Sequence, residues 1–386
     1  MIADKEVYHE IYVGTKVGTF KRYISKLKQT IDIVDAKNVQ KGDEITHLTW
    51  KNADENEILI GQRNGLIKTF DTASQKLKHT KTIPLENEDH LIGLGITDAN
   101  KLLTALKSGI VSIWNGKNAT NINAGLALDK MRVCSFDLSK CATGGRENPL
   151  KLWDLNTQKN IFMSKNVPHD ELQLRVPVWV SDMTFLSNSE IVTASRYDNI
   201  CFYDIRAQRR PITRIQFDDA TYSCVSSCYN DKLIAAGGGK GLIQVIDVRK
   251  PGKILHKYKG SVGAVKDIAC DKNLPFMFTV SLDRRLRIYD INQPRLLEET
   301  YLVSSLNCVL IKQFNVKTEK EEVESKLENV DKVEDTFEQN KDFENGTEDL
   351  VYESKDIYDD SEISKANVKR KKVDKFVKNK KVKNKA

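Results

Sequence analysis

A short pattern of alternating apolar and polar residues recurs through the first three hundred residues of the chain. Each copy starts from a turn, most often at a Gly or polar residue, continues as a strand-like alternation and ends in Asp or Asn. The copies are 65–71, 109–115, 149–154, 199–204, 241–247 and 285–290, and their last residues lie 44, 39, 50, 43 and 43 positions apart. This spacing is typical of WD-type repeats, in which each repeat forms a four-stranded propeller blade. A weaker copy at 18–24 ends 47 residues before Asp71.

A second strand-like run precedes most copies and ends in small residues. Clear examples are 57–61, 140–144, 190–194, 232–236 and 276–280. Their β-branched and aromatic content favours strands over helices. Because the inner strands of a propeller blade crowd the central channel, we expect these runs to be inner strands.

The two ends of the repeat region complement one another. The first copy lacks one strand, and a further strand-like run follows the last copy at 305–312. If 305–312 supplies the missing inner strand of blade 1, every sheet is complete and the edges are removed. The sequence therefore predicts an all-β protein, a seven-bladed WD40-type β-propeller over residues 1–312, although the Trp-Asp dipeptide occurs only at Trp153-Asp154.

The residues after the repeat region divide into two segments of opposite charge. The 386 residues carry a net charge of +7, but 319–362 holds 18 acidic residues and five Lys, whereas 365–386 holds 11 basic residues and one acid. Such composition cannot bury enough apolar surface to offset chain entropy. We expect a disordered C-terminal tail, formed by an acidic linker at 313–364 and a basic tail at 365–386.

The basic tail has the composition of a nuclear address signal or of a patch that binds nucleic-acid phosphates. A simple solvated tail is the alternative. The cations that define it are Lys369, Arg370, Lys371, Lys372, Lys375, Lys378, Lys380 and Lys381.

Motifs for chemistry are weak. The Gly-rich run 236–241 lacks the Ser or Thr of a phosphate loop, so a tight turn between strands is favoured. Seven Cys without a C-x-x-C pair indicate free thiols in a reducing compartment. Cys224 and Cys228 could be half of a metal site, but buried structural thiols are the favoured interpretation. We expect no enzyme activity, no cofactor and no metal. No secretory signal or membrane-spanning stretch is expected either.

Three regions carry more polar and aromatic residues than ordinary strands require: 143–149, 174–180, and 195–198 together with 206–211. Arg and aromatic side chains are the usual anchors of protein interfaces. Ordinary turn chemistry with solvated Arg is the alternative. The predicted interaction surface consists of Arg146, Glu147, Asn148, Arg175, Pro177, Trp179, Arg196, Tyr197, Arg209 and Arg210.

Several of these segments also carry a family resemblance. Residues 143–148 lead into 150–154, and the run Leu-Arg-Val-Pro-Val-Trp stands at 174–179. Further matching segments are 193–197, 209–211, 260–263 and 282–287. From about residue 8 to 312 the chain resembles the nucleolar WD-repeat factors of large-subunit ribosome assembly.

The resemblance implies a non-catalytic scaffold of the nucleus and nucleolus that docks on early precursors of the large (60S) ribosomal subunit and acts in rRNA processing. It implies neighbours that are other assembly factors and pre-rRNA, and release by an AAA-type ATPase. We expect a monomer with no membrane partner.

A different class of function remains open. The segments Asp204-Ile-Arg206 and Asp247-Val-Arg249 match the Asp-x-Arg signature of propeller substrate receptors in cullin-type ubiquitin ligases. The signature is short and recurs by chance in propellers. A propeller hydrolase is a third, more distant alternative.

Overall fold

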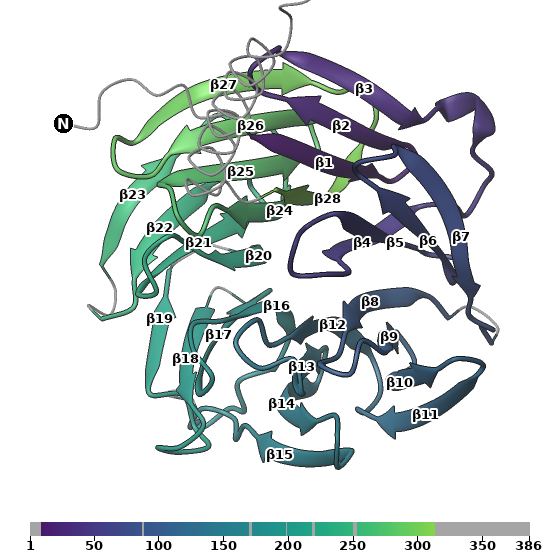
Figure 1. Cartoon of the computed structure of the whole chain (residues 1–386). Helices are drawn as coiled ribbons and strands as arrows, with labels where there is room; N and C mark the ends of the chain where they lie inside the picture. Colours follow the sequence, from purple (N-terminus) through teal and green to yellow (C-terminus); the bar gives the residue numbers. More distant parts are fainter. Residues whose placement is uncertain are drawn as a thin grey trace, which may run out of the picture. The chain divides into compact units, whose positions relative to one another are not determined.

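The repeat region forms seven four-stranded antiparallel sheets in a ring (Figure 1). This computed structural model describes residues 9–86, 89–169, 172–197, 199–217, 221–249 and 253–312. The chain divides into two units, Met1–Lys317 and Thr318–Ala386, and the described residues belong to the first. The predicted seven-bladed, all-β propeller is confirmed. The acidic linker and the basic tail lie outside the described residues. Within the described ranges, no helix is both long and apolar enough to cross a membrane.

The blades are numbered in chain order, and each strand order below runs outward from the channel. Blade 1 consists of β28 (Leu306–Ile311), β1 (Glu10–Thr15), β2 (Phe20–Ile24) and β3 (Gln29–Val34), followed by the short 3₁₀ helix η1 (Ala36–Asn38). Blade 2 consists of β4 (Ile45–Trp50), β5 (Glu57–Gln62), β6 (Leu66–Asp71) and β7 (Lys76–Thr82). Blade 3 consists of β8 (Leu91–Ile96), β9 (Leu102–Leu106), β10 (Ile110–Asn115) and β11 (Asn118–Asn123).

The remaining blades follow the same order. Blade 4 consists of β12 (Leu128–Val133), β13 (Lys140–Gly145), β14 (Asn148–Asp154) and β15 (Lys159–Met163). Blade 5 consists of β16 (Val180–Phe185), β17 (Glu190–Ser195), β18 (Asn199–Asp204) and β19 (Thr213–Gln216). Blade 6 consists of β20 (Tyr222–Ser227), β21 (Leu233–Gly238), β22 (Ile243–Asp247) and β23 (Ile254–Tyr258). Blade 7 consists of β24 (Val265–Cys270), β25 (Phe276–Ser281), β26 (Arg285–Asp290) and β27 (Arg295–Tyr301).

The recurring pattern corresponds to the third strand of each blade, and its terminal Asp has a local role. The carboxylate of Asp71 accepts a hydrogen bond from the backbone N–H of Ala73 at 2.9 Å. Asp154 and Asp290 accept from the N–H two residues later in the same way, also at 2.9 Å. Such Asx-type turns start the loop to the outer strand. The repeat therefore ends in Asp because that side chain forms the turn.

Closure of the ring joins segments from opposite ends of the repeat region. Strand β28 pairs antiparallel with β1, with Val309 opposite Val13 and Ile311 opposite Ile11. The indole Nε1 of Trp50 in blade 2 donates to the carbonyl of Ile311 at 3.1 Å. The innermost strands contact one another in the order β4, β8, β12, β16, β20, β24, β28 and back to β4. The described sheets therefore form a closed ring.

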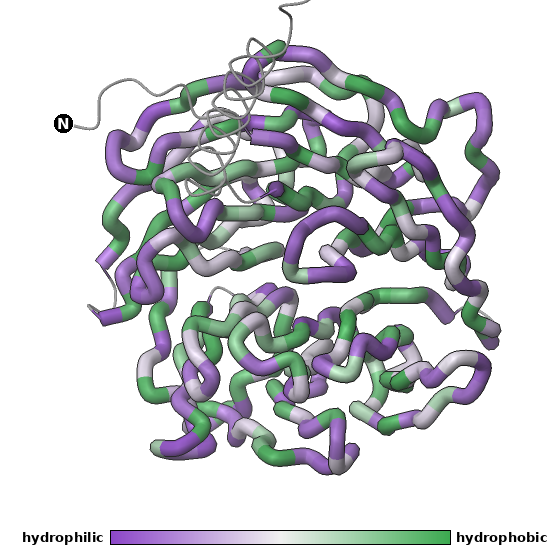
Figure 2. Tube along the Cα trace, viewed as in Figure 1, coloured by the Kyte–Doolittle hydropathy of each residue, from purple (hydrophilic) through white to green (hydrophobic). Residues whose placement is uncertain are grey.

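Small residues on the second strands allow neighbouring blades to approach closely. A side-chain carbon added at Gly14 would lie 2.5 Å from Ile45 Cγ2, and one added at Gly61 would lie 2.8 Å from Leu91 Cδ2. In both cases the obstructing residue belongs to the innermost strand of the next blade. Apolar side chains fill the remaining space between blades, for example Ile11, Phe278 and Leu306 between blades 7 and 1. Figure 2 shows hydrophobic residues recurring along the strands and hydrophilic residues in many connecting loops.

Because strands alternate in direction, the ring has two ends. We call one of these ends the upper face. At this end the second strand of each blade turns into the third, and each blade connects to the next. Residues 146–147, 196–197 and 282–284 are turns of this face, and the described residues 164–169, 172–179 and 302–305 belong to connections between blades.

Candidate interaction surface

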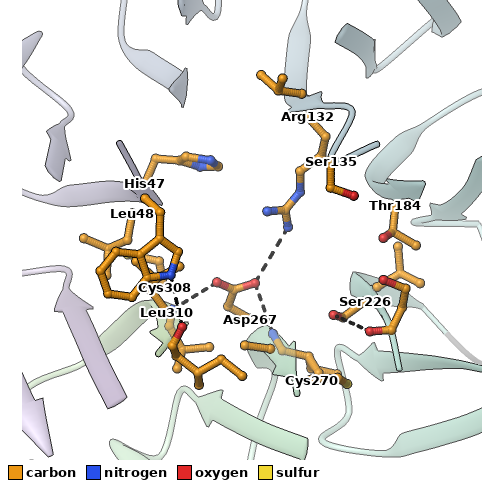
Figure 3. Close-up of a pocket in the computed structure, with 18 of the residues that line it drawn as sticks. His47, Leu48, Arg132, Ser135, Thr184, Ser226, Asp267, Cys270, Cys308 and Leu310 are labelled. Atoms are coloured by element: carbon orange, nitrogen blue, oxygen red, sulfur yellow. Dashed lines mark hydrogen bonds and ion pairs between the residues drawn. The ribbon is translucent and has the colours of Figure 1, made fainter. Parts of the chain in front are cut away.

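The channel contains a cavity of about 300 Å³, lined largely by the innermost strands. Figure 3 shows Arg132 of β12 pointing toward Asp267 of β24, with His47 on β4. The Nε and Nη2 atoms of Arg132 donate to the two carboxylate oxygens of Asp182 at 3.2 and 3.0 Å. Arg132 Nη2 also lies 3.9 Å from Asp267 Oδ1, and Lys130 Nζ lies 3.8 Å from Asp182 Oδ1.

These channel groups largely balance one another. Burial raises the pKa of Asp182, but the attraction of Arg132 and Lys130 outweighs burial and holds it below its ordinary value. For Asp267, burial prevails over the same two cations, and the pKa is raised. Burial, with the repulsion of both cations, lowers the pKa of His47 well below its ordinary value. Lys130 and Arg132 of blade 4, Asp182 of blade 5 and Asp267 of blade 7 form a charge network that links blades, and this supports a structural role for the channel.

The cysteines are buried free thiols. Cys224 and Cys228 belong to one apolar cluster, and the sulfur of Cys228 lies 3.7 Å from that of Cys270. Burial raises the pKa of Cys141 to about 12 and that of Cys201 to about 11. The part of the chain that the structure describes contains no group of three or more His, Cys, Asp or Glu placed to hold a metal.

Most of the predicted interaction residues meet on the upper face of blades 4 and 5. The segment ending at Trp179 is clamped between two turns: the N–H of Glu147 donates to the carbonyl of Val178 at 2.8 Å, and the N–H of Arg196 donates to the carbonyl of Trp179 at 3.1 Å. Arg146 and Trp179 form an isolated antiparallel bridge. The motifs at 143–149, 174–180 and 195–197 therefore build one structure.

Trp179 is the centre of this arrangement. Its indole Nε1 donates to Asp129 at 2.7 Å, which fixes the ring. The ring of Tyr197 meets it edge-on, with centroids 5.8 Å apart, and the guanidinium of Arg146 lies 5.2 Å from the indole centroid. Edge-on aromatic pairs and cation–π contacts each contribute about 0.5–1.5 kcal/mol at such sites. The ring is therefore held in place while Arg146 and Tyr197 stay exposed.

A charge pair flanks the centre. Arg175 Nη2 lies 2.7 Å from Glu147 Oε2, while Glu147 Oε1 accepts from the N–H of Val178 at 3.2 Å. The side chains of Arg175 and Glu147 are 65% and 50% exposed. Such solvated pairs contribute about 0–1 kcal/mol, so a partner can compete for either group. Pro177 and Arg196 are exposed beside them.

Three leucines on the surrounding loops are not among the residues predicted from the sequence. Leu126, Leu172 and Leu174 are 82%, 78% and 58% exposed. The loop that carries Leu126 is joined to the cluster, because the N–H of Arg146 donates to the carbonyl of Ala127 at 3.1 Å. Apolar residues in otherwise polar connections were the available signal. We call "Arg–Trp surface" the set Arg146, Glu147, Arg175, Pro177, Trp179, Arg196 and Tyr197 with these three leucines.

Of the three remaining residues of the predicted set, the structure buries one and places two on a neighbouring loop. Asn148 is buried, and its Nδ2 donates to the carbonyls of Ala124 and Gly125 at 3.2 and 3.1 Å, so it holds a turn together. Arg209 and Arg210 are exposed on the loop that follows β18. β18 ends opposite the upper face, but this loop is joined to the connection that follows β15: Arg209 Nε donates to the carbonyl of Met163 at 2.7 Å, and the N–H of Lys165 donates to the carbonyl of Arg209 at 2.9 Å.

The remaining family segments, 260–263 and 282–287, meet around a buried arginine in blade 7. The side chain of Arg287 is 2% exposed. Its Nη2 donates to Asp283 at 2.6 Å and to the carbonyl of Gly260 at 3.1 Å, and its Nη1 donates to Ser261 and Ser281 at 3.2 and 2.8 Å. This network fixes the upper turns of blade 7.

The Asp-x-Arg segments are accounted for by turn geometry. Arg249 Nη2 lies 2.7 Å from Asp247 Oδ2, and the N–H of Arg249 donates to the same carboxylate at 2.9 Å. Arg206 makes the same backbone contact with Asp204 at 3.0 Å. Both segments form the same Asx turn as the other blades, and an Arg stands two residues after the Asp. Nothing in the described residues favours the ligase-receptor alternative.

Seven closed blades with an arginine and aromatic cluster on one face define a WD-type β-propeller, a rigid scaffold whose loops present its binding groups. The chain is 32% identical over 322 residues to "WD repeat-containing protein 74" of Bos taurus, which covers 81% of this chain and 83% of the relative. It is 30% identical over 322 residues to the Homo sapiens protein of that name, with the same coverage. The chain belongs to the family of WD repeat-containing protein 74.

A fungal relative is more distant. The chain is 26% identical over 225 residues to "Ribosome biogenesis protein NSA1" of Meyerozyma guilliermondii, which covers 49% of this chain and 56% of that protein. No family model matches the chain.

Proposed function

We propose that this protein is a non-catalytic WD-repeat scaffold that acts as an assembly factor in ribosome biogenesis. The printed names of the fungal relatives support this role. We further propose that it acts at an early nuclear or nucleolar stage of large-subunit assembly and rRNA processing, and that an AAA-type ATPase releases it. The family resemblance of the segments around Trp179 and Arg287 supports these finer steps.

The observation that carries the proposal is the fixed position of Trp179 between Arg146 and Tyr197. Hot-spot residues of protein interfaces are enriched in Trp, Tyr and Arg. A partner that covers Trp179 gains an immobilised aromatic surface at little cost in side-chain entropy. The surrounding arginines suit carboxylates of an assembly factor or phosphates of pre-rRNA. We therefore propose that the Arg–Trp surface docks the propeller on the pre-ribosomal particle.

Affinity purification of the tagged full-length chain, with sequencing of the bound RNA, tests the proposed role. Enrichment of large-subunit pre-rRNA together with large-subunit assembly factors is the expected outcome. Recovery of cullin adaptors without pre-rRNA would replace the proposal with the ligase-receptor alternative. The release step predicts that an ATPase variant unable to hydrolyse ATP retains the protein on the particle.

A further inference from the structure

Blade 7 presents a second group of exposed apolar side chains on the upper face. Val262, Leu282 and Val303 are 79%, 50% and 63% exposed. Their loops adjoin: the N–H of Leu282 donates to the carbonyl of Ala264 at 2.9 Å, and Arg284 Nη1 donates to the carbonyl of Val303 at 3.2 Å. We call these three side chains the aliphatic patch. Isolated exposed apolar residues are ordinary, but an adjoining group marks a binding surface.

The backbone of Val303 is held in a conformation that valine disfavours. Its φ is +65°, and the N–H of Ser304 donates to the carbonyl of Leu302 at 2.7 Å, which closes a γ-turn around Val303. Positive φ is a genuine outlier for a β-branched residue, and this form of γ-turn is rare. Glycine would adopt the turn without strain. The exposed valine side chain therefore adds strain to the folded chain and little packing.

The turns beneath the patch are rigid. The N–H of Leu302 donates to the carbonyl of Arg284 at 2.9 Å, and the N–H of Lys16 donates to the carbonyl of Ser305 at 2.8 Å. The buried Arg287 network described above fixes the turns that carry Val262 and Leu282. The patch is thus preorganised, which lowers the entropy lost when a partner binds.

Glu299 near the patch is paired with Arg285 and Arg287, at 3.2 and 2.8 Å. The exposed charges beside the patch that have no ion-pair partner among the described residues are positive. Lys16, Lys259 and Arg284 are exposed, and none of them forms an ion pair with a carboxylate of the described residues. The adjacent carboxylate of Asp283 is already bound to Arg287 at 2.6 Å. A partner segment that brings its own carboxylates complements this rim.

We propose that the aliphatic patch docks a segment of a partner protein whose aliphatic side chains are flanked by Asp or Glu. This surface differs in chemistry from the Arg–Trp surface, which is aromatic and guanidinium-rich. A propeller with both surfaces binds two different partners on one face. The inference goes beyond the proposed function and is tested on the purified chain, so its failure leaves the proposed role in ribosome assembly untouched.

The test is selection of phage-displayed random peptides on the full-length protein, with counter-selection on a Leu282→Asp variant. Recovered peptides should combine Ile, Leu or Val with Asp or Glu. Their affinity should fall about tenfold or more in Leu282→Asp, as expected for an interface anchor, and likewise in the double variant Lys16→Glu/Arg284→Glu. The matched control Leu138→Asp places the same change at an exposed leucine outside the patch and should bind normally. The double variant Arg175→Glu/Arg196→Glu should also bind normally.

The variant Val303→Gly distinguishes an effect on peptide binding from an effect on folding. It should bind the selected peptides more weakly while its melting temperature is unchanged or higher, because glycine accepts the positive φ. A lower melting temperature in this variant would contradict the strained, exposed role of Val303. The proposal is overturned if the selection yields no peptide that depends on Leu282, or peptides that are basic or aromatic. It is also overturned if the parent chain self-associates and Leu282→Asp abolishes this, because a second copy would then occupy the patch. It is overturned as well if Lys16→Glu/Arg284→Glu weakens RNA binding and leaves peptide binding unchanged.

Discussion

The carboxylate of Asp267 accepts a hydrogen bond from the backbone N–H of Val309 at 3.0 Å, which links the innermost strand of blade 7 to the closing strand β28. Asp182 and the N–H of Val225 repeat this bond at 3.2 Å between blades 5 and 6. The closing strand, which completes blade 1, is thus joined to blade 7 through the same kind of contact that connects blades 5 and 6.

Removing these carboxylates should destabilise the ring to different extents. Asp182→Ala leaves the Arg132 guanidinium without its bidentate partner, at a cost of about 3–5 kcal/mol. Asp267→Ala leaves the N–H of Val309 unpaired, at a cost of about 1–3 kcal/mol. Urea unfolding measures both, with Asp231→Ala on an exposed loop as the control. Equal unfolding free energies for all three variants would show that the channel network does not hold the blades together.

Truncation tests closure. Deleting residues 320–386 should leave the melting temperature nearly unchanged, because the seven sheets are then complete. Deleting 303–386 removes β28 and exposes the edge of β1. That truncation should abolish soluble monomer, as seen by size-exclusion chromatography. Similar behaviour of the two truncated chains would contradict closure by β28.

His47 should make stability depend on pH. Burial, together with Lys130 and Arg132, lowers its pKa well below the ordinary value. The unfolded chain binds a proton at this residue below pH ~6.5, whereas the folded chain does not, so stability is lost as pH falls from ~7 to ~5. His47→Gln should lose less, by up to about 1.4 kcal/mol per pH unit. Parallel pH profiles for the variant and the parent, from urea unfolding, would assign the acid response to other groups.

The fold was predictable because each blade repeats the same local requirements. A turn-forming Asp such as Asp71 and a small residue such as Gly61 are needed at fixed places in a blade, so they recur at the spacing of one blade. Each copy alone is weak evidence for a blade, but copies that recur at one spacing support one another. The missing strand followed from the same count, since a blade with three strands would leave an edge exposed.

The surface was only partly predictable, because sequence distance does not say at which end of a blade a loop emerges. Arg209 follows the motif at 193–197 closely in sequence, but β18 carries the chain to the other end of the blade before the loop of Arg209 bonds to Met163 and Lys165. Asn148 belongs to a polar motif, yet its side-chain amide donates its hydrogen bonds to the carbonyls of a neighbouring turn. Exposed residues such as Leu126 and Val303 show no periodicity, so only the structure distinguishes them from core residues.

The basic tail, residues 365–386, is predicted to be an electrostatic RNA anchor as well as an import signal. Binding of the tail peptide to structured RNA should fall steeply with salt, because the slope follows the number of phosphates neutralised. Scrambling its order should matter little, whereas replacing Lys by Gln should abolish binding. Including residues 319–362 should weaken binding at low salt and make little difference at high salt. Fluorescence anisotropy across a salt series measures this, and a flat response would leave only the import role.

Docking of the propeller on a pre-ribosomal particle through the Arg–Trp surface can be measured by co-sedimentation of a charge-reversed variant. The variant is Arg175→Glu/Arg196→Glu, and the control Lys117→Glu/Lys159→Glu makes the same change of charge at exposed lysines away from this surface. Both should keep the circular dichroism spectrum of the parent chain. We predict that the control sediments with large-subunit precursors in a sucrose gradient while Arg175→Glu/Arg196→Glu remains in the free fractions. Normal co-sedimentation of the Arg175→Glu/Arg196→Glu variant would contradict the account and move the docking site elsewhere.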